Sequence, residues 1–169
     1  AAAMPHASKP QKGGDMKLKS TLKVFNQSEV PQSAGVIPGL TIKRLAGSTL
    51  HPSERINVGL ATFAAGTHEH LHWHMIETFH YVLSGQAIVR DIEGNSYNVS
   101  AGDIVYGPPG LRGAHEWDVK EALQILTIKA TNAPERAIQF NLEGEAKQSS
   151  ADLQYLIERG VADMKESIY

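Results

Sequence analysis

Short runs of apolar and β-branched residues, separated by glycine, proline, asparagine and serine, fill the middle of the chain. Closely spaced runs of this kind, with no helical period between them, predict an antiparallel sandwich or barrel. Glu93-Gly94-Asn95, between two runs, has the composition of a tight hairpin turn. The expected strands are Leu40–Leu45, Arg55–Phe63, His70–His74, Glu77–Leu83, Gln86–Ile92, Ser96–Val99, Asp103–Tyr106, His115–Val119 and Leu123–Ala130.

The two ends of the chain have a different pattern. Residues 1–20 are polar, rich in Ala, Gly and Lys, and without periodicity, which indicates a flexible tail or an expression remnant. Residues 149–169 place Leu153, Leu156 and Ile157 at helical spacing, behind serines that suit an N-cap. We therefore expect one all-β domain over residues 21–140 and a short C-terminal helix.

Composition removes several classes of protein. The net charge of -2 gives no basic footprint for nucleic acid, so no nucleic-acid partner is expected. No apolar run approaches the ~18 residues of a membrane span, so no membrane association is expected. The absence of cysteine excludes disulfides and thiolate metal sites, which leaves nitrogen and oxygen ligands. No secretory hydrophobic region is visible, and a cytoplasmic protein is expected, although a removed signal peptide would leave no trace.

Histidines cluster in one expected strand. His68, His70, His72 and His74 alternate, and strict alternation would project all four from one face of the strand. Imidazole is the commonest protein ligand for Zn, Fe, Cu and Ni, so this pattern predicts a metal site. In a straight strand His68 would lie roughly 20 Å from His74, because the rise is ~3.3 Å per residue, and a single ion cannot bind both.

Two half-motifs support this interpretation. Gly66-Thr-His-Glu-His-Leu-His72-Trp-His74 and Gly102-Asp-Ile-Val-Tyr-Gly-Pro108-Pro-Gly110 resemble, in order and spacing, the two motifs of the cupin superfamily, G-(X)5-H-X-H-(X)3,4-E-(X)6-G and G-(X)5-P-X-G-(X)2-H-(X)3-N. The resemblance covers roughly residues 40–130. It implies a double-stranded β-helix, the jelly-roll barrel of cupins, with one divalent metal bound inside. It also implies a homodimer, because cupins commonly pair strands between subunits.

The resemblance implies His72 and His74 as ligands, but the chain departs from the pattern at the next one. Thr78 stands where the family has its glutamate, and Glu77 comes one residue early. Alternation would point Glu77 away from the face of Thr78, unless a bulge after His74 turns it inward. Three possibilities stay open: Glu77 as a ligand, His80 as a substitute ligand, or neither.

The second motif departs as well. Gly113 stands at the position of the family's histidine, and His115 follows two residues later. A wider turn over residues 111–114 would bring His115 to the metal, and we expect it as the third ligand. Among the remaining residues we expect His70 and His80 to line the substrate pocket, with Thr78, Tyr106 and Arg112; Arg112 could bind a carboxylate.

Neutral imidazoles with at most one carboxylate suit Fe(II), and also Zn, Mn or Ni. We expect an enzyme, most simply an Fe(II)-dependent dioxygenase that cleaves a small oxygen-chelating organic substrate such as a diketone. A redox-neutral lyase, decarboxylase or isomerase using Mn, Zn or Ni is the first alternative. A non-enzymatic module that binds a small molecule or stores metal is the second.

Overall fold

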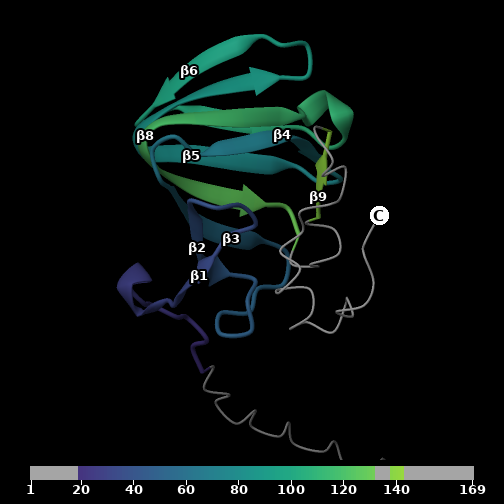
Figure 1. The fold of residues 1–169 in the computed structure, drawn as a ribbon. Coiled ribbons are helices and arrows are strands. Elements are labelled where there is room, and N and C mark those ends of the chain that lie inside the picture. Colours follow the sequence, from purple (N-terminus) through teal and green to yellow (C-terminus); the bar gives the residue numbers. More distant parts are fainter. Residues whose placement is uncertain (1–18, 132–137, 143–169) are drawn as a thin grey trace, which may run out of the picture.

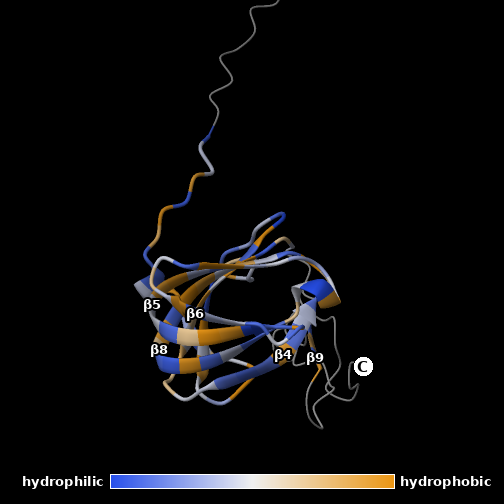
Figure 2. Cartoon of the chain, turned by 90° about the horizontal axis from the view of Figure 1, so that it is seen from above, coloured by the Kyte–Doolittle hydropathy of each residue, from blue (hydrophilic) through white to orange (hydrophobic). Residues whose placement is uncertain are grey.

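Two long strands, β5 (Thr78–Asp91) and β8 (His115–Lys129), run antiparallel along the whole barrel (Figure 1). The computed structural model describes residues 19–131 and 138–142. The first part of β8 pairs with β4 (His68–His74), and its second part pairs with β3 (Asn57–Phe63). The long strands therefore pass from one half of the barrel to the other, and Figure 2 shows the strands curling round an interior.

Shorter strands complete the sheet. β6 and β7 pair with the two halves of β5, and β2 and β1 extend the sheet beyond β3. β9 pairs with the free edge of β4, next to the histidines. The bounds of the remaining elements are β1 (Gln32–Ala34), β2 (Leu40–Ala46), β6 (Ser96–Ser100), β7 (Ile104–Gly107), β9 (Gln139–Asn141), and the single 3-10 turns η1 (Gln27–Glu29) and η2 (Leu111–Gly113).

The all-β barrel predicted from the sequence is confirmed, with differences in how the strands join. Four of the expected strands join into two longer ones. The stretches before and after Ser84-Gly85 together form β5, and those before and after residues 120–122 together form β8. β1 and β9 were not predicted, because each has only three residues and too short a pattern to recognise. The predicted C-terminal helix and most of the predicted N-terminal tail lie outside the described residues.

Gly85 explains why two expected strands are one. Its φ is +85°, and a Cβ on this residue would lie 2.1 Å from the Ala122 carbonyl oxygen. The register between β5 and β8 shifts on both sides of this point. Ser84-Gly85 therefore forms a bulge inside a continuous strand, where glycine supplies a conformation that other residues adopt at a cost.

Replacing Gly85 with alanine is expected to destabilise the fold by about 3 kcal/mol or more. The left-handed conformation alone costs about 1–2 kcal/mol, and the new methyl group must also displace the backbone of β8. Gly94→Ala is a matched control, because Gly94 has a φ of +87° with nothing within 4 Å of the added Cβ. Urea unfolding should give about 1–2 kcal/mol for the control. Equal losses in the two variants would contradict a packing role for Gly85.

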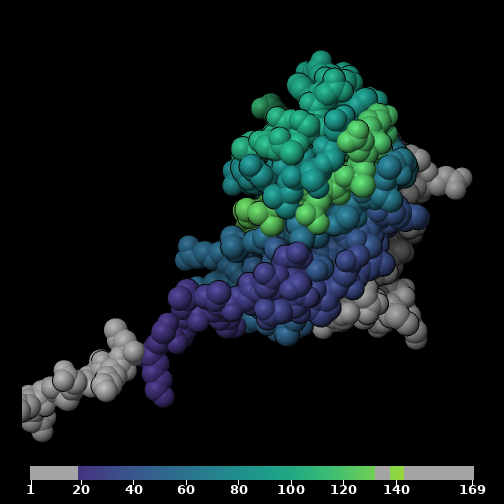
Figure 3. All heavy atoms as spheres, turned by 90° about the vertical axis from the view of Figure 1, so that its left-hand side faces the viewer, coloured from purple at the N-terminus to yellow at the C-terminus, as the bar shows by residue number. Residues whose placement is uncertain are grey.

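The hydrophobic core fills the barrel below the histidines. Trp117 and Leu123 are fully buried at its centre, and Phe63 and Val82 pack with them. Residues 25–31, just before β1, lie against the outside of the barrel, where Phe25 stacks on His51 and the Lys43 ammonium donates to the Gln27 carbonyl (Figure 3). No helix in the described ranges has the length and apolar character needed to cross a membrane.

Candidate functional site

A bulge in β4 decides which histidines face the interior. Glu69 pairs with Trp117 and His72 pairs with His115, so three steps along β4 match two steps along β8. The extra residue reverses the alternation: Glu69, His72 and His74 are buried, while His68 is exposed. The prediction that all four alternating histidines share one face is therefore wrong, because a period of two does not survive a bulge.

Four histidines meet inside the barrel. His72 and His74 come from β4, His80 from β5 and His115 from β8, and all four are buried. The ring centroid of His72 lies 5.3 Å from that of His74 and 4.5 Å from that of His115. The His80 centroid lies 5.3 Å from that of His115 and 5.5 Å from that of Trp117, so the indole of Trp117 forms the floor of the cluster.

The Nδ1 atom of each of these rings is engaged. His72 donates to the His70 carbonyl at 2.6 Å, and His115 donates to the Gly113 carbonyl at 2.8 Å. His74 donates to the Ile138 carbonyl at 3.0 Å, and His80 hydrogen-bonds the Thr127 hydroxyl. A carbonyl can only accept, so Nδ1 carries the proton and Nε2 keeps its lone pair for a ligand.

Nε2 is unsatisfied in two of these rings. Among buried side-chain atoms of the described residues, Nε2 of His80 and Nε2 of His115 have no hydrogen-bond partner. A buried unpaired polar atom usually costs ~1–3 kcal/mol, so two of them in one cluster indicate that a ligand belongs there.

Burial keeps these imidazoles neutral. Loss of hydration lowers the pKa of His72 to about 4, and it lowers the pKa of His115 to about 4 as well, with His72 adding a repulsive contribution. Burial also lowers the pKa of His74 and His80 well below the usual value. Neutral imidazole is the form that coordinates a metal, so the cluster is in that form at neutral pH.

Thr78 lies beside this cluster. It is buried, and its hydroxyl and the His115 ring both border Gly107 of β7: a Cβ on Gly107 would lie 2.6 Å from Thr78 Oγ1 and 3.4 Å from His115 Cε1. A glycine at position 107 therefore leaves room for both side chains. The position at which the motif resemblance would place a glutamate is occupied by a neutral hydroxyl.

Glu77 does not join the histidines, contrary to one of the expectations from sequence. It is exposed, and its carboxylate accepts a 2.7 Å hydrogen bond from the Tyr106 hydroxyl. Thr78 opens β5 directly after it, so alternation holds and no bulge turns Glu77 inward. Tyr106, which was expected in the pocket, lies with Glu77 on the outside and is 55% exposed.

Two further expected pocket residues lie elsewhere. Arg112 is exposed in the turn η2, so it does not line the interior. His70 is half-buried and its ring packs edge-on against His68, with centroids 5.1 Å apart. The turn η2 itself agrees with the wider turn expected before His115, and it brings that residue into register with His72.

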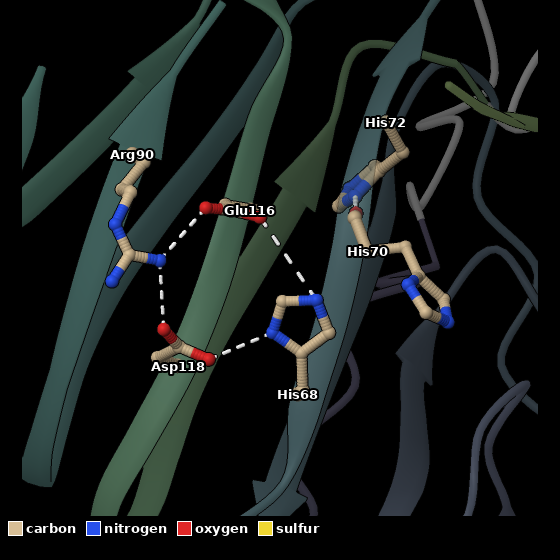
Figure 4. A network of polar contacts seen from close by, with 6 residues as sticks. All are labelled: His68, His70, His72, Arg90, Glu116 and Asp118. Carbon is tan, nitrogen blue, oxygen red and sulfur yellow. Dashed lines mark hydrogen bonds and ion pairs between the residues drawn. The ribbon is translucent and has the colours of Figure 1, made fainter. Parts of the chain in front are cut away.

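The outer face carries a polar network instead (Figure 4). The Arg90 guanidinium donates to Glu116 at 2.8 Å and to Asp118 at 2.7 Å. His68 Nδ1 lies 2.7 Å from the Asp118 carboxylate, and this pairing and that with Arg90 lower the pKa of Asp118. The network links β4, β8 and β5 on the side away from the core. His68 therefore takes part in contacts between strands there.

Two ionisable residues on the inner face were not predicted from the sequence. Glu69 is buried, and burial raises its pKa against the opposing effects of His115, Lys129 and a hydrogen bond from Gln139. Lys129 is half-buried at the end of β8, opposite Thr78, and burial lowers its pKa. The inward-facing row of Leu123, Ile125 and Thr127 could have predicted that Lys129 also faces inward. The inward position of Glu69 could not be predicted, because it depends on the bulge in β4.

β9 also contributes to the site. It places Gln139 opposite His74 and Asn141 opposite His72, and both amides are buried. The preceding Ile138 carbonyl is the acceptor that orients His74. A three-residue strand 65 residues after His74 therefore closes the edge of the site, which no local pattern could have indicated.

The chemistry of the four histidines suits a metal ion, and some of the distances between their rings suit one as well. Two imidazoles bound to one ion through ~2.1 Å bonds have centroids about 4.5–5.2 Å apart. The His72–His74 and His72–His115 separations agree with this, but the His74–His115 separation of 6.5 Å is about 1 Å too long. In the described residues no three His, Asp or Glu side chains are already placed to hold an ion, so binding requires a small rotation of these rings.

Comparisons with known proteins agree with this fold. The family model for the cupin domain matches residues 59–129. The chain is 42% identical over 66 residues to auxin-binding protein T85 from Nicotiana tabacum, a match that covers 39% of this chain and 35% of that protein. It is 32% identical over 117 residues to auxin-binding protein 1 from Arabidopsis thaliana, covering 62% of this chain and 57% of that protein.

Among solved structures, the polyketide cyclase RemF from Streptomyces resistomycificus superposes with a TM-score of 0.64 at 17% identity, covering 75% of this chain and 89% of that one. This likeness concerns the fold. The matched curated relatives are covered over less than two thirds of their length. Residues 59–129 are a cupin domain, and the barrel described above is the cupin fold.

Proposed function

We propose that this protein is a metal-dependent cupin enzyme, and more finely an Fe(II)-dependent dioxygenase acting on a small oxygen-chelating substrate. The observation that carries the proposal is the set of four buried, neutral histidines whose Nδ1 atoms are already engaged. The residues that would hold the ion are His72, His74 and His115, with His80 as a possible fourth donor. Glu77 is not included, because its carboxylate lies on the outer surface.

Iron would supply the redox chemistry of oxidative carbon–carbon cleavage. The chain's own residues supply the rest. The carbonyls of His70, Gly113 and Ile138 fix the tautomer and limit rotation of the ligand rings. Trp117 and the apolar core below it keep water out of the floor of the site.

The test begins with anaerobic purification and a measurement of bound metals. The metal-free protein is then loaded separately with Fe(II), Mn(II), Zn(II) and Ni(II), and oxygen uptake is followed with diketones, thiols and catechols. Iron-dependent uptake with one substrate class is the expected result. Absence of iron dependence together with absence of uptake for every class would overturn the dioxygenase proposal.

A redox-neutral reaction is the second candidate, and Glu69 and Lys129 favour it. Both are ionisable, both lie on the inner face, and burial shifts the pKa of each toward neutrality, as suits groups that exchange protons with a substrate. Turnover under argon with Mn, Zn or Ni, followed by proton exchange or lyase products in NMR spectra, would select this candidate over the first.

A third candidate is binding without turnover. The two curated relatives are named for binding auxin, and the partial similarity to them supports a ligand-binding role. Saturable binding of an auxin by calorimetry, with no product after prolonged incubation with any loaded metal, would favour it.

A homodimer and a cytoplasmic location remain predictions. Light scattering would check the first, and cell fractionation would check the second.

A further inference from the structure

Lys129 is a cation on the inner face of the barrel. It is not among the proposed metal ligands. The residues before it on β8 alternate inward: Leu123 and Ile125 are in the core, and the Thr127 hydroxyl reaches His80. Lys129 continues this row and pairs across the sheet with Thr78, which borders Gly107 together with the His115 ring. Register therefore brings its side chain toward the histidine cluster.

Electrostatic interactions agree with that placement. The Lys129 charge contributes to lowering the pKa of His72, His74, His80 and His115. It also opposes the effect of burial on Glu69. These effects fall with distance, so they agree with the position that the register gives Lys129, near the histidine cluster.

Within the described part of the chain, no anionic side chain neutralises this ammonium directly. The Lys129 ammonium makes no ion pair within 4.0 Å and no side-chain hydrogen bond to these residues, so its interaction with Glu69 acts over a longer distance. Arg44 adds a second positive charge whose repulsion helps to lower the pKa of Lys129. A half-buried lysine without a close counter-ion is a group whose partner a ligand can provide.

The charge balance inside the barrel favours the same class of ligand. The four histidines are neutral, so they would not compensate the two charges of a bound divalent ion. Glu69 contributes at most one negative charge, against the positive charge of Lys129. The interior then carries an excess of positive charge, which an anionic substrate would reduce.

We propose that Lys129 binds a carboxylate of the substrate and so selects small organic acids whose other oxygen reaches the metal site. The choice of substrate class rests on the proposed function, whereas the anion site of Lys129 itself does not depend on a bound metal. Lys129 is in this sense a specificity-determining residue on the strand that also carries His115.

The test compares two ligands that differ in charge and hardly in shape, pyruvate and pyruvamide. Binding is titrated by ligand-observed NMR with metal-free protein, because a bound metal would itself prefer the anion. Wild-type protein should bind pyruvate about tenfold more tightly than pyruvamide. Lys129→Met should bind the two within about twofold, through loss of pyruvate affinity alone.

Three variants make the result specific. Lys129→Arg should keep most of the preference for the anion, and Lys120→Met, which removes an exposed lysine of the same strand, should keep all of it. Glu69→Gln should tighten pyruvate binding, and more so toward higher pH where Glu69 is ionised, because a nearby negative charge is then removed while an amide can still pair with Gln139. This variant gives an answer even if Lys129→Met does not fold.

The outcomes separate this proposal from the proposed function. Equal binding of pyruvate and pyruvamide by wild type, or an unchanged preference in Lys129→Met, would overturn the role of Lys129. A metal-free preference that disappears in Lys129→Met would support it even if the wild-type protein retained no metal, a result that would count against the metal-dependent enzyme only. Metal content should be the same in wild type and Lys129→Met.

Discussion

Lowering the pH from 7 to 4.5 is expected to remove about 3–5 kcal/mol from the stability of the metal-free protein. His72 and His115 have pKa values of about 4 in the folded protein, against an ordinary value of 6.5. Between these values the unfolded chain binds more protons, so stability is complete above pH 6.5 and falls as the pH approaches 4. Each histidine would contribute about 2–3 kcal/mol at pH 4.5, at ~1.4 kcal/mol per unit, and coupling makes the sum less than additive.

Such a loss is a large part of the ~5–15 kcal/mol by which domains are usually stable. His74 and His80, whose pKa values are also lowered, act in the same direction. Glu69 opposes them, because a carboxyl group with a raised pKa takes up a proton more readily in the folded state and gains stability on acidification. The net effect remains acid destabilisation, since several histidines act against one carboxyl group.

Urea unfolding of chelator-treated protein at several pH values between 7 and 4.5 measures this dependence. His115→Asn should flatten the curve, because it removes one titrating ring and keeps a polar side chain near Gly113. Protein loaded with metal should hold its stability to lower pH, because the ion competes with protons for Nε2. Constant stability between pH 7 and 5 in the metal-free protein would contradict the neutral, buried state of the cluster.

The class of fold could be predicted from the sequence because its signals are local. Period-two runs, turn residues and the spacing from Gly66 to His74 all lie within short segments. The same spacing selected His72 and His74, which the structure brings together with His115. The prediction did not extend to strand continuity, because Ser84-Gly85 has turn composition whether it ends a strand or forms a bulge.

Which residues of β4 face inward was harder to predict from the sequence. Alternation back from the inward-facing His72 predicts His70 on the inside and Glu69 on the outside, and the bulge reverses both. A bulge depends on which residues of β8 lie opposite β4, and 45 residues of chain separate Glu69 from His115. Gln139 and the Ile138 carbonyl were missed for the same reason, because β9 reaches the site through pairing with a strand far away in the sequence.

The second large effect concerns metal affinity: His74→Ala is expected to weaken binding by at least about a hundredfold, and Glu77→Gln to leave it within about twofold. Loss of groups that merely orient ligands costs about 10–100-fold, so loss of a ligand should cost no less. Glu77 is a suitable control because it is the neighbouring carboxylate that the family pattern suggests, yet it lies outside with Tyr106.

Competition of Zn(II) or Fe(II) with a chromophoric chelator measures these affinities, and circular dichroism confirms that each variant is folded. His80→Asn then decides the number of donors. Its unpaired Nε2 and the 5.3 Å separation from His115 favour a fourth donor, so a loss comparable with that of His74→Ala is expected if His80 binds the ion directly. A loss of tenfold or less would make His80 a neighbour of a three-histidine site. If Glu77→Gln instead weakened binding as much as His74→Ala, the chain would have to bulge after His74 when metal binds, and the histidine-only site would be wrong.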